Sequence, residues 1–270
     1  MIFLIAIPVL HLELPMYKKL LFFVFLFNAC TIHALPLKLT DINKKSQQLD
    51  ININSTGVKT LSVKENTYQG KVAFNAMPLI NITQELPKTA TVKFVASDGF
   101  SSLISAGTLF YSKATPYLAI EESHWPRSLR GGKTAGPFYL IWENAEAGQI
   151  KQEQWPYQIT ELVIQQDIKV QYKDIYPDHL SPKAQSGFEL FINNCFVCHQ
   201  LNQIGDAIIG PDLNQPMNPT DYFKAEALKK FIRDPKSVRQ WKSMQMPSFD
   251  QEALTERDIN TLIQYLTEIK

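Results

Sequence analysis

The chain contains little cysteine and little net charge, and both shortages exclude classes of protein. Its 270 residues include 3 cysteines, which are Cys30, Cys195 and Cys198. No disulfide framework can be drawn from them, and a structural zinc site would need a second Cys/His pair that the sequence lacks. The formal net charge is +1, so the chain has no general electrostatic attraction to nucleic acid, and we predict no nucleic-acid partner.

Long apolar runs are also scarce, and the clearest one lies near the N-terminus. A short basic stretch begins at Met16, residues 20–27 are apolar, and the small residue Ala34 follows. This order predicts residues 1–34 as a signal segment, with translation starting at Met16 and cleavage before Leu35. A retained membrane anchor is one alternative, although the apolar run is short for a span of ~20 residues. Lipidation of Cys30 is another.

Two of the three cysteines form a spaced motif with a histidine. Cys195 and Cys198 are separated by two residues, and His199 follows directly. This is the attachment motif of a c-type haem, because the two thiols can bond to the vinyl groups of one haem and the histidine can reach its iron. A thioredoxin-like redox site would require a nearby βαβ pattern, whereas residues 186–192 predict a short amphipathic helix. We therefore predict one covalent haem c, with His199 as an iron ligand.

The rest of the chain divides into two parts of different character. Residues 35–176 predict a β-rich domain, with strand patterns at 49–54, 92–96, 138–142 and 162–164 and an ambiguous stretch at 101–110. Residues 177–185 carry two prolines and several turn formers, which predicts a linker. Residues 186–270 are predicted to be helical. The expected fold class is α+β multidomain, with the β-rich domain followed by an all-α domain.

Two helices are predicted after the cysteine motif. The middle one covers residues 221–234. Basic side chains are frequent on it and just after it, and this basic region is either a solvated face or a docking surface; it comprises Lys224, Lys229, Lys230, Arg233, Lys236, Arg239 and Lys242. The last one covers residues 255–269, where Thr255 and Asp258 match a capping box and apolar residues recur on one face.

The segment from about residue 181 to 270 resembles a class I mono-haem cytochrome c. Besides the cysteine motif, the likeness rests on Gly187 and Phe191 before it, Gly210 and Pro211 after it, and the sequence Met-Pro-Ser-Phe at residues 246–249. The resemblance implies that Gly187 allows the last helix to cross closely, with Tyr265 as the aromatic residue at the crossing.

The same resemblance implies roles around the iron. The carbonyl of Pro211 would accept a hydrogen bond from the second nitrogen of His199, which orients the ring and makes it a better donor to iron. Met246 would be the sixth ligand, and Met244 would pack elsewhere. Histidine and methionine together raise the reduction potential relative to two histidines. The implied cofactor-binding residues are Cys195, Cys198, His199, Pro211 and Met246, with His199 and Met246 as the metal ligands.

The β-rich domain loosely resembles the sulfite-oxidase-type molybdopterin-binding fold over residues 49–165. The likeness rests on turn motifs in the same order, at residues 68–70, 97–100, 131–132 and 136–142. That family holds molybdenum through a cysteine thiolate, and no cysteine lies between Leu35 and Asn194. We therefore predict a relative without molybdopterin; an unrelated β-rich domain is the alternative. Two weaker hypotheses concern single sites in this domain. One is that His124 is a metal ligand, and the other is that an anion-binding site is formed by Arg127, Arg130 and Lys133.

Together these patterns predict an exported electron carrier. It would be a periplasmic mono-haem c-type cytochrome that passes single electrons between periplasmic or membrane redox proteins, with no catalytic residue assigned. If the signal segment at residues 1–34 were not cleaved, or if Cys30 were lipidated, the protein would be attached to the membrane. The alternative function is a haem-containing enzyme, or a subunit of a sulfite-dehydrogenase-like oxidoreductase.

Overall fold

The computed structural model of the chain describes all residues except 1–33, 66–67, 69, 122–124, 126–131 and 208. The chain divides into two units, Met1–Ile32 and His33–Lys270, and the described residues all lie in the second unit. The predicted leader, its cleavage site and Cys30 lie outside them. None of the helices in the described part is long and apolar enough to cross a membrane.

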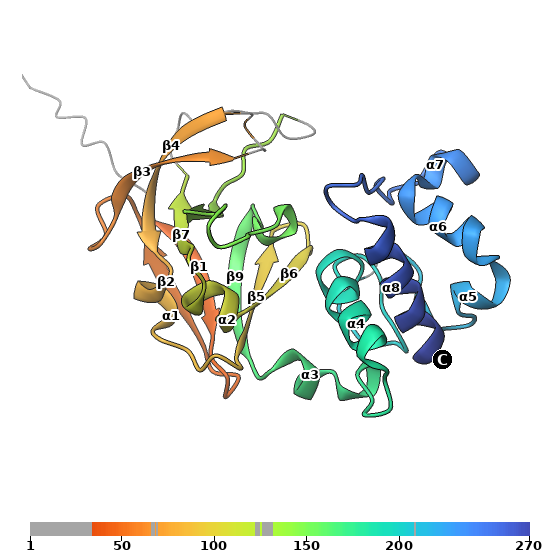
Figure 1. The fold of residues 1–270 in the computed structure, drawn as a ribbon. Coiled ribbons are helices and arrows are strands. Elements are labelled where there is room, and N and C mark those ends of the chain that lie inside the picture. The colour runs from red at the N-terminus through yellow and green to blue at the C-terminus, as the bar shows by residue number, and fades with distance from the viewer. Residues whose placement is uncertain (1–33, 66–67, 69, 122–124, 126–131, 208) are drawn as a thin grey trace, which may run out of the picture. The chain divides into compact units, whose positions relative to one another are not determined.

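The first part of the described chain forms one sheet, in which nine strands are described (Figure 1). Its main path runs β2-β1-β9-β8-β7-β4-β3, and β5 pairs with both β9 and β6. The β1–β9 pair is parallel and the others are antiparallel. The strands are β1 (Leu35–Thr40), β2 (Ser46–Ile51), β3 (Lys59–Glu65), β4 (Gly70–Pro78), β5 (Thr91–Ala96), β6 (Ser101–Ser105), β7 (Thr115–Ile120), β8 (Phe138–Glu143) and β9 (Ile159–Gln165).

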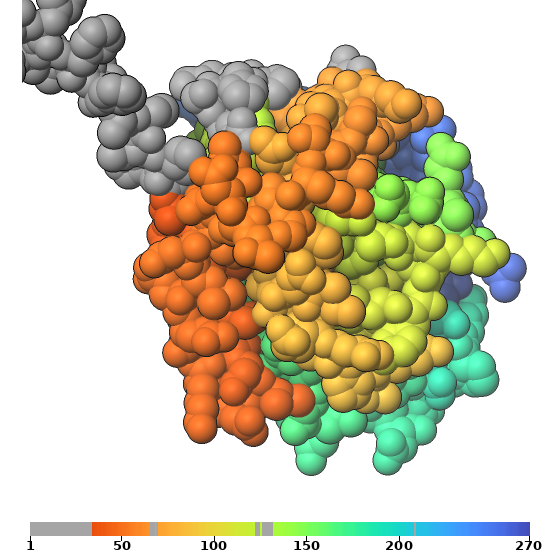
Figure 2. Space-filling view, turned by 90° about the vertical axis from the view of Figure 1, so that its left-hand side faces the viewer, coloured from red at the N-terminus to blue at the C-terminus, as the bar shows by residue number. Residues whose placement is uncertain are grey.

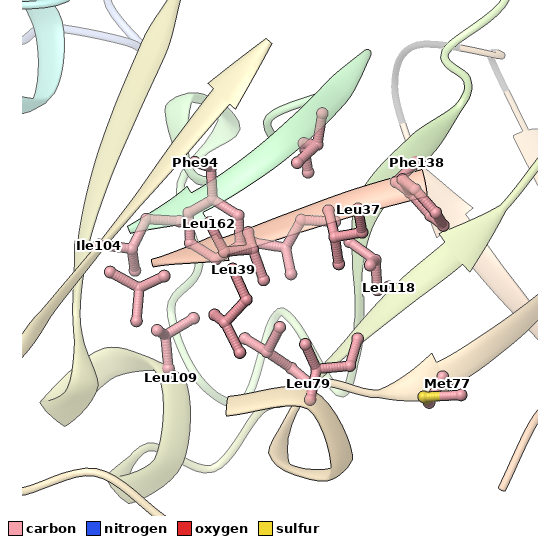
Figure 3. Packing of buried hydrophobic residues seen from close by; sticks show 14 of the residues in the cluster. Leu37, Leu39, Met77, Leu79, Phe94, Ile104, Leu109, Leu118, Phe138 and Leu162 are labelled. Carbon is pink, nitrogen blue, oxygen red and sulfur yellow. The ribbon is translucent and has the colours of Figure 1, made fainter. Parts of the chain in front are cut away.

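Strand β8 is buried on both faces, which explains its continuous apolar sequence. Phe138, Leu140 and Trp142 face the larger core, while Tyr139 and Ile141 face a smaller aromatic core on the opposite side. Successive side chains of a strand point to opposite faces, so a strand covered on both sides has no polar alternation. Figure 3 shows the larger core, where leucines from several strands and α2 meet.

The predicted strands at residues 92–96, 138–142 and 162–164 are confirmed as β5, β8 and β9. The strand predicted at 49–54 is wrong at its end, because β2 stops at Ile51. Asn52 and Ser55 then form a turn, in which the N–H of Ser55 donates to the carbonyl of Asn52. Asparagine and serine favour such turns through their own side-chain hydrogen bonds, and this outweighs the alternating pattern.

The ambiguous stretch at residues 101–110 contains one strand and one helix. Strand β6 ends at Ser105, whose side-chain oxygen accepts a hydrogen bond from the N–H of Thr108 and caps helix α2 (Ala106–Tyr111). The other short helices of the sheet domain are α1 (Ile80–Thr83) and the 3-10 turn η1 (Gln152–Gln154). Figure 2 shows the face of this domain with the red-orange β1 and β2 beside the light-orange and yellow segments that include α1 and α2.

The chain from residue 168 onward is helical. It contains α3 (Ile168–Gln171), the 3-10 turn η2 (Lys173–Ile175), α4 (Pro182–Asn194), α5 (Pro219–Tyr222), α6 (Ala225–Arg233), α7 (Pro235–Val238) and α8 (Glu256–Glu268). A β-rich sheet followed by helices is the fold class predicted from the sequence, and it is confirmed. Helix α4 begins at Pro182, so residues 182–185 of the predicted linker are helical.

Helices α4 and α8 cross at Gly187. A Cβ atom on Gly187 would lie 2.3 Å from the carbonyl oxygen of Thr261 and 2.6 Å from the Cβ of Tyr265. Only glycine permits this approach, as the resemblance to cytochromes implied. The expected capping box is also present, since Thr255 and Asp258 exchange hydrogen bonds at the start of α8.

The helix predicted at 221–234 is wrong as a single element. The chain forms α5 and α6 instead, because Phe223 between them has an extended backbone with φ −94° and ψ 139°. The ring of Phe223 stacks on Phe231, with 5.4 Å between their centroids. Ring packing therefore sets the break, and helical periodicity alone does not reveal it.

Candidate haem-binding site

The cysteine motif continues the last turn of α4. Cys195 is the C-terminal cap, and its N–H donates to the carbonyl of Phe191 at 2.8 Å. The N–H groups of Cys198 and His199 then donate to the carbonyl of Cys195 at 3.0 and 2.8 Å. These bonds fold the motif into a tight turn at the end of a helix that α8 holds in place. The two thiols and the imidazole are therefore presented by a rigid element.

The two thiols lie in an environment that keeps them protonated. Burial and the neighbouring Cys198 raise the pKa of Cys195 to about 12, and burial also raises the pKa of Cys198. Thiol–disulfide redox sites work through cysteines whose pKa is lowered. The surroundings of this motif therefore argue against the thioredoxin-like alternative.

The imidazole of His199 is oriented by one hydrogen bond. Its Nδ1 lies 2.7 Å from the carbonyl oxygen of Pro211. A carbonyl can only accept, so Nδ1 carries the proton and the Nε2 of the neutral ring keeps its lone pair. Burial lowers the pKa of His199, which favours this neutral form. An imidazole held in this way is ready to donate Nε2 to a metal.

Gly210 packs against the same ring, although the sequence analysis gave it no role of its own. A Cβ on Gly210 would lie 2.4 Å from Cε1 and 2.5 Å from Nδ1 of His199. The N–H of Gly210 donates to the carbonyl of Cys198 at 2.7 Å, which closes the loop over the motif. The residue must therefore be glycine because the imidazole lies against its backbone. The Gly-Pro pair signalled a turn, and the contact with the ring was visible only in three dimensions.

Asp212 also supports this loop and was missed by the sequence analysis. Its carboxylate accepts four main-chain N–H groups, from Asn202, Gln203, Asn214 and Gln215, at 2.5 to 3.2 Å. One side chain thus ties together two loop segments on either side of Pro211. The clue was an aspartate among asparagines, which favour turns through side-chain to main-chain bonds.

The two candidate methionines lie in the segment between α7 and α8. Met244 and Met246 are both partly buried, and the N–H of Met244 donates to the carbonyl of Trp241 at 3.1 Å. Phe249, at the end of the Met-Pro-Ser-Phe sequence, packs against the helical core. The assignment of Met246 as the sixth ligand stays a prediction.

The family model of cytochrome c matches residues 184–270. These residues form a cytochrome c domain. The family implies haem c and an electron-carrying role for this domain. The donors present fit that cofactor, because two thiols at the attachment spacing precede an imidazole whose Nε2 is free to ligate iron. No curated protein matches the chain.

The predicted likeness of the β-rich domain to the molybdopterin-binding fold is not confirmed. The family match begins at residue 184 and leaves this domain without an assignment. Of the weaker hypotheses, His124, Arg127 and Arg130 lie outside the described residues. Among the residues that are described, no three His, Cys, Asp or Glu side chains lie together in a way that could hold a metal ion.

The basic region falls on α6, α7 and the segment that follows. Two of its cations have partners, since Lys229 pairs with Glu226 at 2.7 Å and Arg233 pairs with Glu256 at 2.8 Å. The other cations of this region are exposed, namely Lys224, Lys230, Lys236, Arg239 and Lys242. Whether they dock a redox partner stays a prediction.

Proposed function

We propose that the protein is an exported single-haem c-type cytochrome that carries single electrons between periplasmic or membrane redox proteins. The observation that supports it most is the 2.7 Å contact between Nδ1 of His199 and the carbonyl of Pro211. It sets the tautomer that an iron-ligating imidazole needs, directly after the two thiols.

In this proposal Cys195 and Cys198 anchor the haem, and His199 and Met246 ligate its iron. When bound, the haem supplies an iron that alternates between the ferric and ferrous states. Ligation on both sides suits a carrier, because the electron then moves with little rearrangement and no substrate reaches the iron. The protonated Nδ1 of His199 stays on Pro211, so the imidazole ligand keeps its orientation in both redox states.

The attachment is tested on the purified full-length protein, matured in an exporting host. We expect the haem stain to remain on the chain in denaturing electrophoresis and to survive acid–acetone extraction. A variant with both cysteines changed to serine is the control and should lose the stain. Haem that leaves the intact protein on extraction would contradict covalent attachment.

Metal analysis and location test the rest of the proposal. We expect one iron per chain and no molybdenum, with the mature protein in the periplasmic or membrane fraction. Molybdenum in the purified protein would instead support the sulfite-dehydrogenase-like alternative. A protein retained in the cytoplasm without haem would contradict export.

A further inference from the structure

Arg233, the last residue of α6, collects four hydrogen-bond acceptors from the chain that follows Met246. Its Nη1 lies 2.6 Å from each of three main-chain carbonyl oxygens, those of Phe249, Asp250 and Leu254. Its Nη2 donates to the carboxylate of Glu256 at 2.8 Å. The Arg233 side chain is 22% exposed, whereas that of Glu256 is 59% exposed, so the guanidinium is partly buried and its carboxylate partner faces solvent.

The four acceptors use both terminal nitrogens of the guanidinium, which the single nitrogen of an ammonium cannot match. Three carbonyls surround one nitrogen that has two N–H groups, so at least one N–H is shared between two acceptors. The positive charge strengthens each bond, and the guanidinium also lowers the pKa of Glu256, which keeps this pair charged at neutral pH. The Nε–H of Arg233 is buried and has no hydrogen-bond partner among the described residues. All the bonds of the guanidinium are therefore directed at this one stretch of chain.

One backbone bond and one side-chain bond add to these at the same place. The N–H of Phe249 donates to the carbonyl of Arg233 at 3.1 Å. The hydroxyl of Ser248 donates to the carboxylate of Asp234 at 3.1 Å. The end of α6 thus holds the chain from two residues after Met246 onward.

The chain next to Met246 is held much less on its other side. In the part of the structure that is described, residues 245–247 make no hydrogen bond, and Met244 bonds only to the nearby carbonyl of Trp241. The position of the Met246 thioether therefore depends on the bonds that Arg233 and Asp234 make with residues 248–256.

We propose that Arg233 is a positioning residue for the sixth iron ligand, and that it sets how readily the Met246 thioether leaves the iron. The inference rests on the proposed function, in which Met246 ligates the iron. A thioether is a neutral ligand that an added ligand can replace once the chain moves away. The bonds that Arg233 makes with residues 249–256 oppose that movement. Removing these bonds should therefore raise the population of the state in which the thioether is away from the iron.

The test compares Arg233→Met and Arg233→Lys with the wild-type holoprotein. Imidazole is added to the ferric form, and its apparent affinity is read from the visible spectrum. In Arg233→Met we expect the apparent affinity for imidazole to rise at least ten-fold. This corresponds to a decrease of about 1.4 kcal/mol in the free energy needed to displace the thioether. The near-infrared sulfur-to-iron band should weaken and the reduction potential should fall. Arg233→Lys should lie between the two, because an ammonium cannot reach all four acceptors.

Two control variants separate this effect from loss of charge and from loss of stability. Lys236→Met removes an exposed cation of α7 that is not bonded to the described residues 248–256, and it should leave imidazole binding unchanged. Leu266→Ala removes a buried side chain of α8, where Leu266 is 3% exposed. It should lower the urea midpoint of the domain without a comparable rise in imidazole affinity.

Each outcome decides the inference. If Arg233→Met keeps wild-type imidazole affinity and a full band, or if Leu266→Ala raises the affinity equally, Arg233 has no positioning role. If Arg233→Met yields no haem protein, Arg233→Lys decides, and a wild-type affinity there overturns the inference. A wild-type protein without the sulfur-to-iron band would show that the proposed Met246 ligation has itself failed, and the inference would fall with it. If the wild type shows the sulfur-to-iron band and Arg233→Met leaves this band unchanged, the inference is wrong and the proposed function stands.

Discussion

Changing Gly187 to alanine should separate α4 from α8 and destabilise the cytochrome c domain. The added Cβ would lie 2.3 Å from the carbonyl oxygen of Thr261 and 2.6 Å from the Cβ of Tyr265. Both atoms belong to the rigid part of α8, so neither can rotate away. Normal contacts of these kinds need about 1 Å more, and the helices must move apart by a similar amount.

The size of the effect follows from two opposing contributions. Alanine is more favourable than glycine inside a helix by about 1 kcal/mol. Overpacking of a well-packed core costs about 1–3 kcal/mol, and the upper end applies here because two contacts are violated at once. Separation also loosens the packing of Phe188 and Phe191, which are both fully buried. We therefore expect a net loss of about 2 kcal/mol.

Urea unfolding of the ferric holoprotein, followed by the Soret band, measures this loss. A loss of about 2 kcal/mol lowers the urea midpoint by about 1 M for a domain of this size. Ser186→Ala is the matched control, because Ser186 is the exposed neighbour of Gly187 on the same helix and its removal should change little. A Gly187→Ala protein as stable as the wild type, or more stable, would refute the close crossing.

Four other predictions follow from the site and its surroundings. Gly210→Ala should displace the proximal imidazole and reduce the yield of haem protein, measured as the ratio of Soret to protein absorbance; an unchanged ratio with an unchanged potential would contradict the ring contact. Met246→Ala should abolish the near-infrared sulfur-to-iron band and lower the potential, while Met244→Ala should keep the band; the reverse pattern would move the ligand to Met244. A fragment that starts at Ser181 and is exported by a foreign signal should fold and bind haem, because most of the buried core of the helical part lies within residues 184–269. The fragment lacks two buried members of that core, Ile175 and Leu180, so it should be less stable than the same domain in the full chain. An unfolded, haem-free product would contradict independent folding. The pKa of Glu268 is lowered by hydrogen bonds from the backbone N–H and hydroxyl of Ser181, so its contribution to stability is present above the pKa of the unfolded chain and is lost as pH falls through the folded value. Glu268→Gln should thus lower the urea midpoint at pH 7, and the difference from the wild type should shrink as the pH is lowered through the acidic range. A difference that stays constant with pH would argue against this linkage.

The sequence by itself determined the chemistry of the haem-binding segment. The spacing of Cys195, Cys198 and His199 is local, since all three lie within one turn of chain, and no distant residue is needed to recognise it. The strands β5, β8 and β9 were visible for a related reason. Their apolar runs are set by burial of the strand itself, and this leaves a signal in consecutive residues.

Only the tertiary structure revealed how that segment is supported. The contact between Gly210 and the His199 ring and the four bonds of Asp212 join residues that are separated along the chain. The break between α5 and α6 likewise depends on the stacking of Phe223 on Phe231. None of these contacts changes the periodicity of the sequence, so pattern analysis does not detect them.

Arg233 shows the same division most clearly. In the sequence it is one of several cations in a basic region. In the fold it lies at the end of α6, where three carbonyl oxygens and a carboxylate converge on its guanidinium. Composition determines that a charge is present, but the packing of α6 against the chain before α8 decides that this charge is partly buried and bonded. The physical reason is that hydrogen bonds to main-chain carbonyls do not depend on the identity of the accepting residues, so they leave no trace in the sequence.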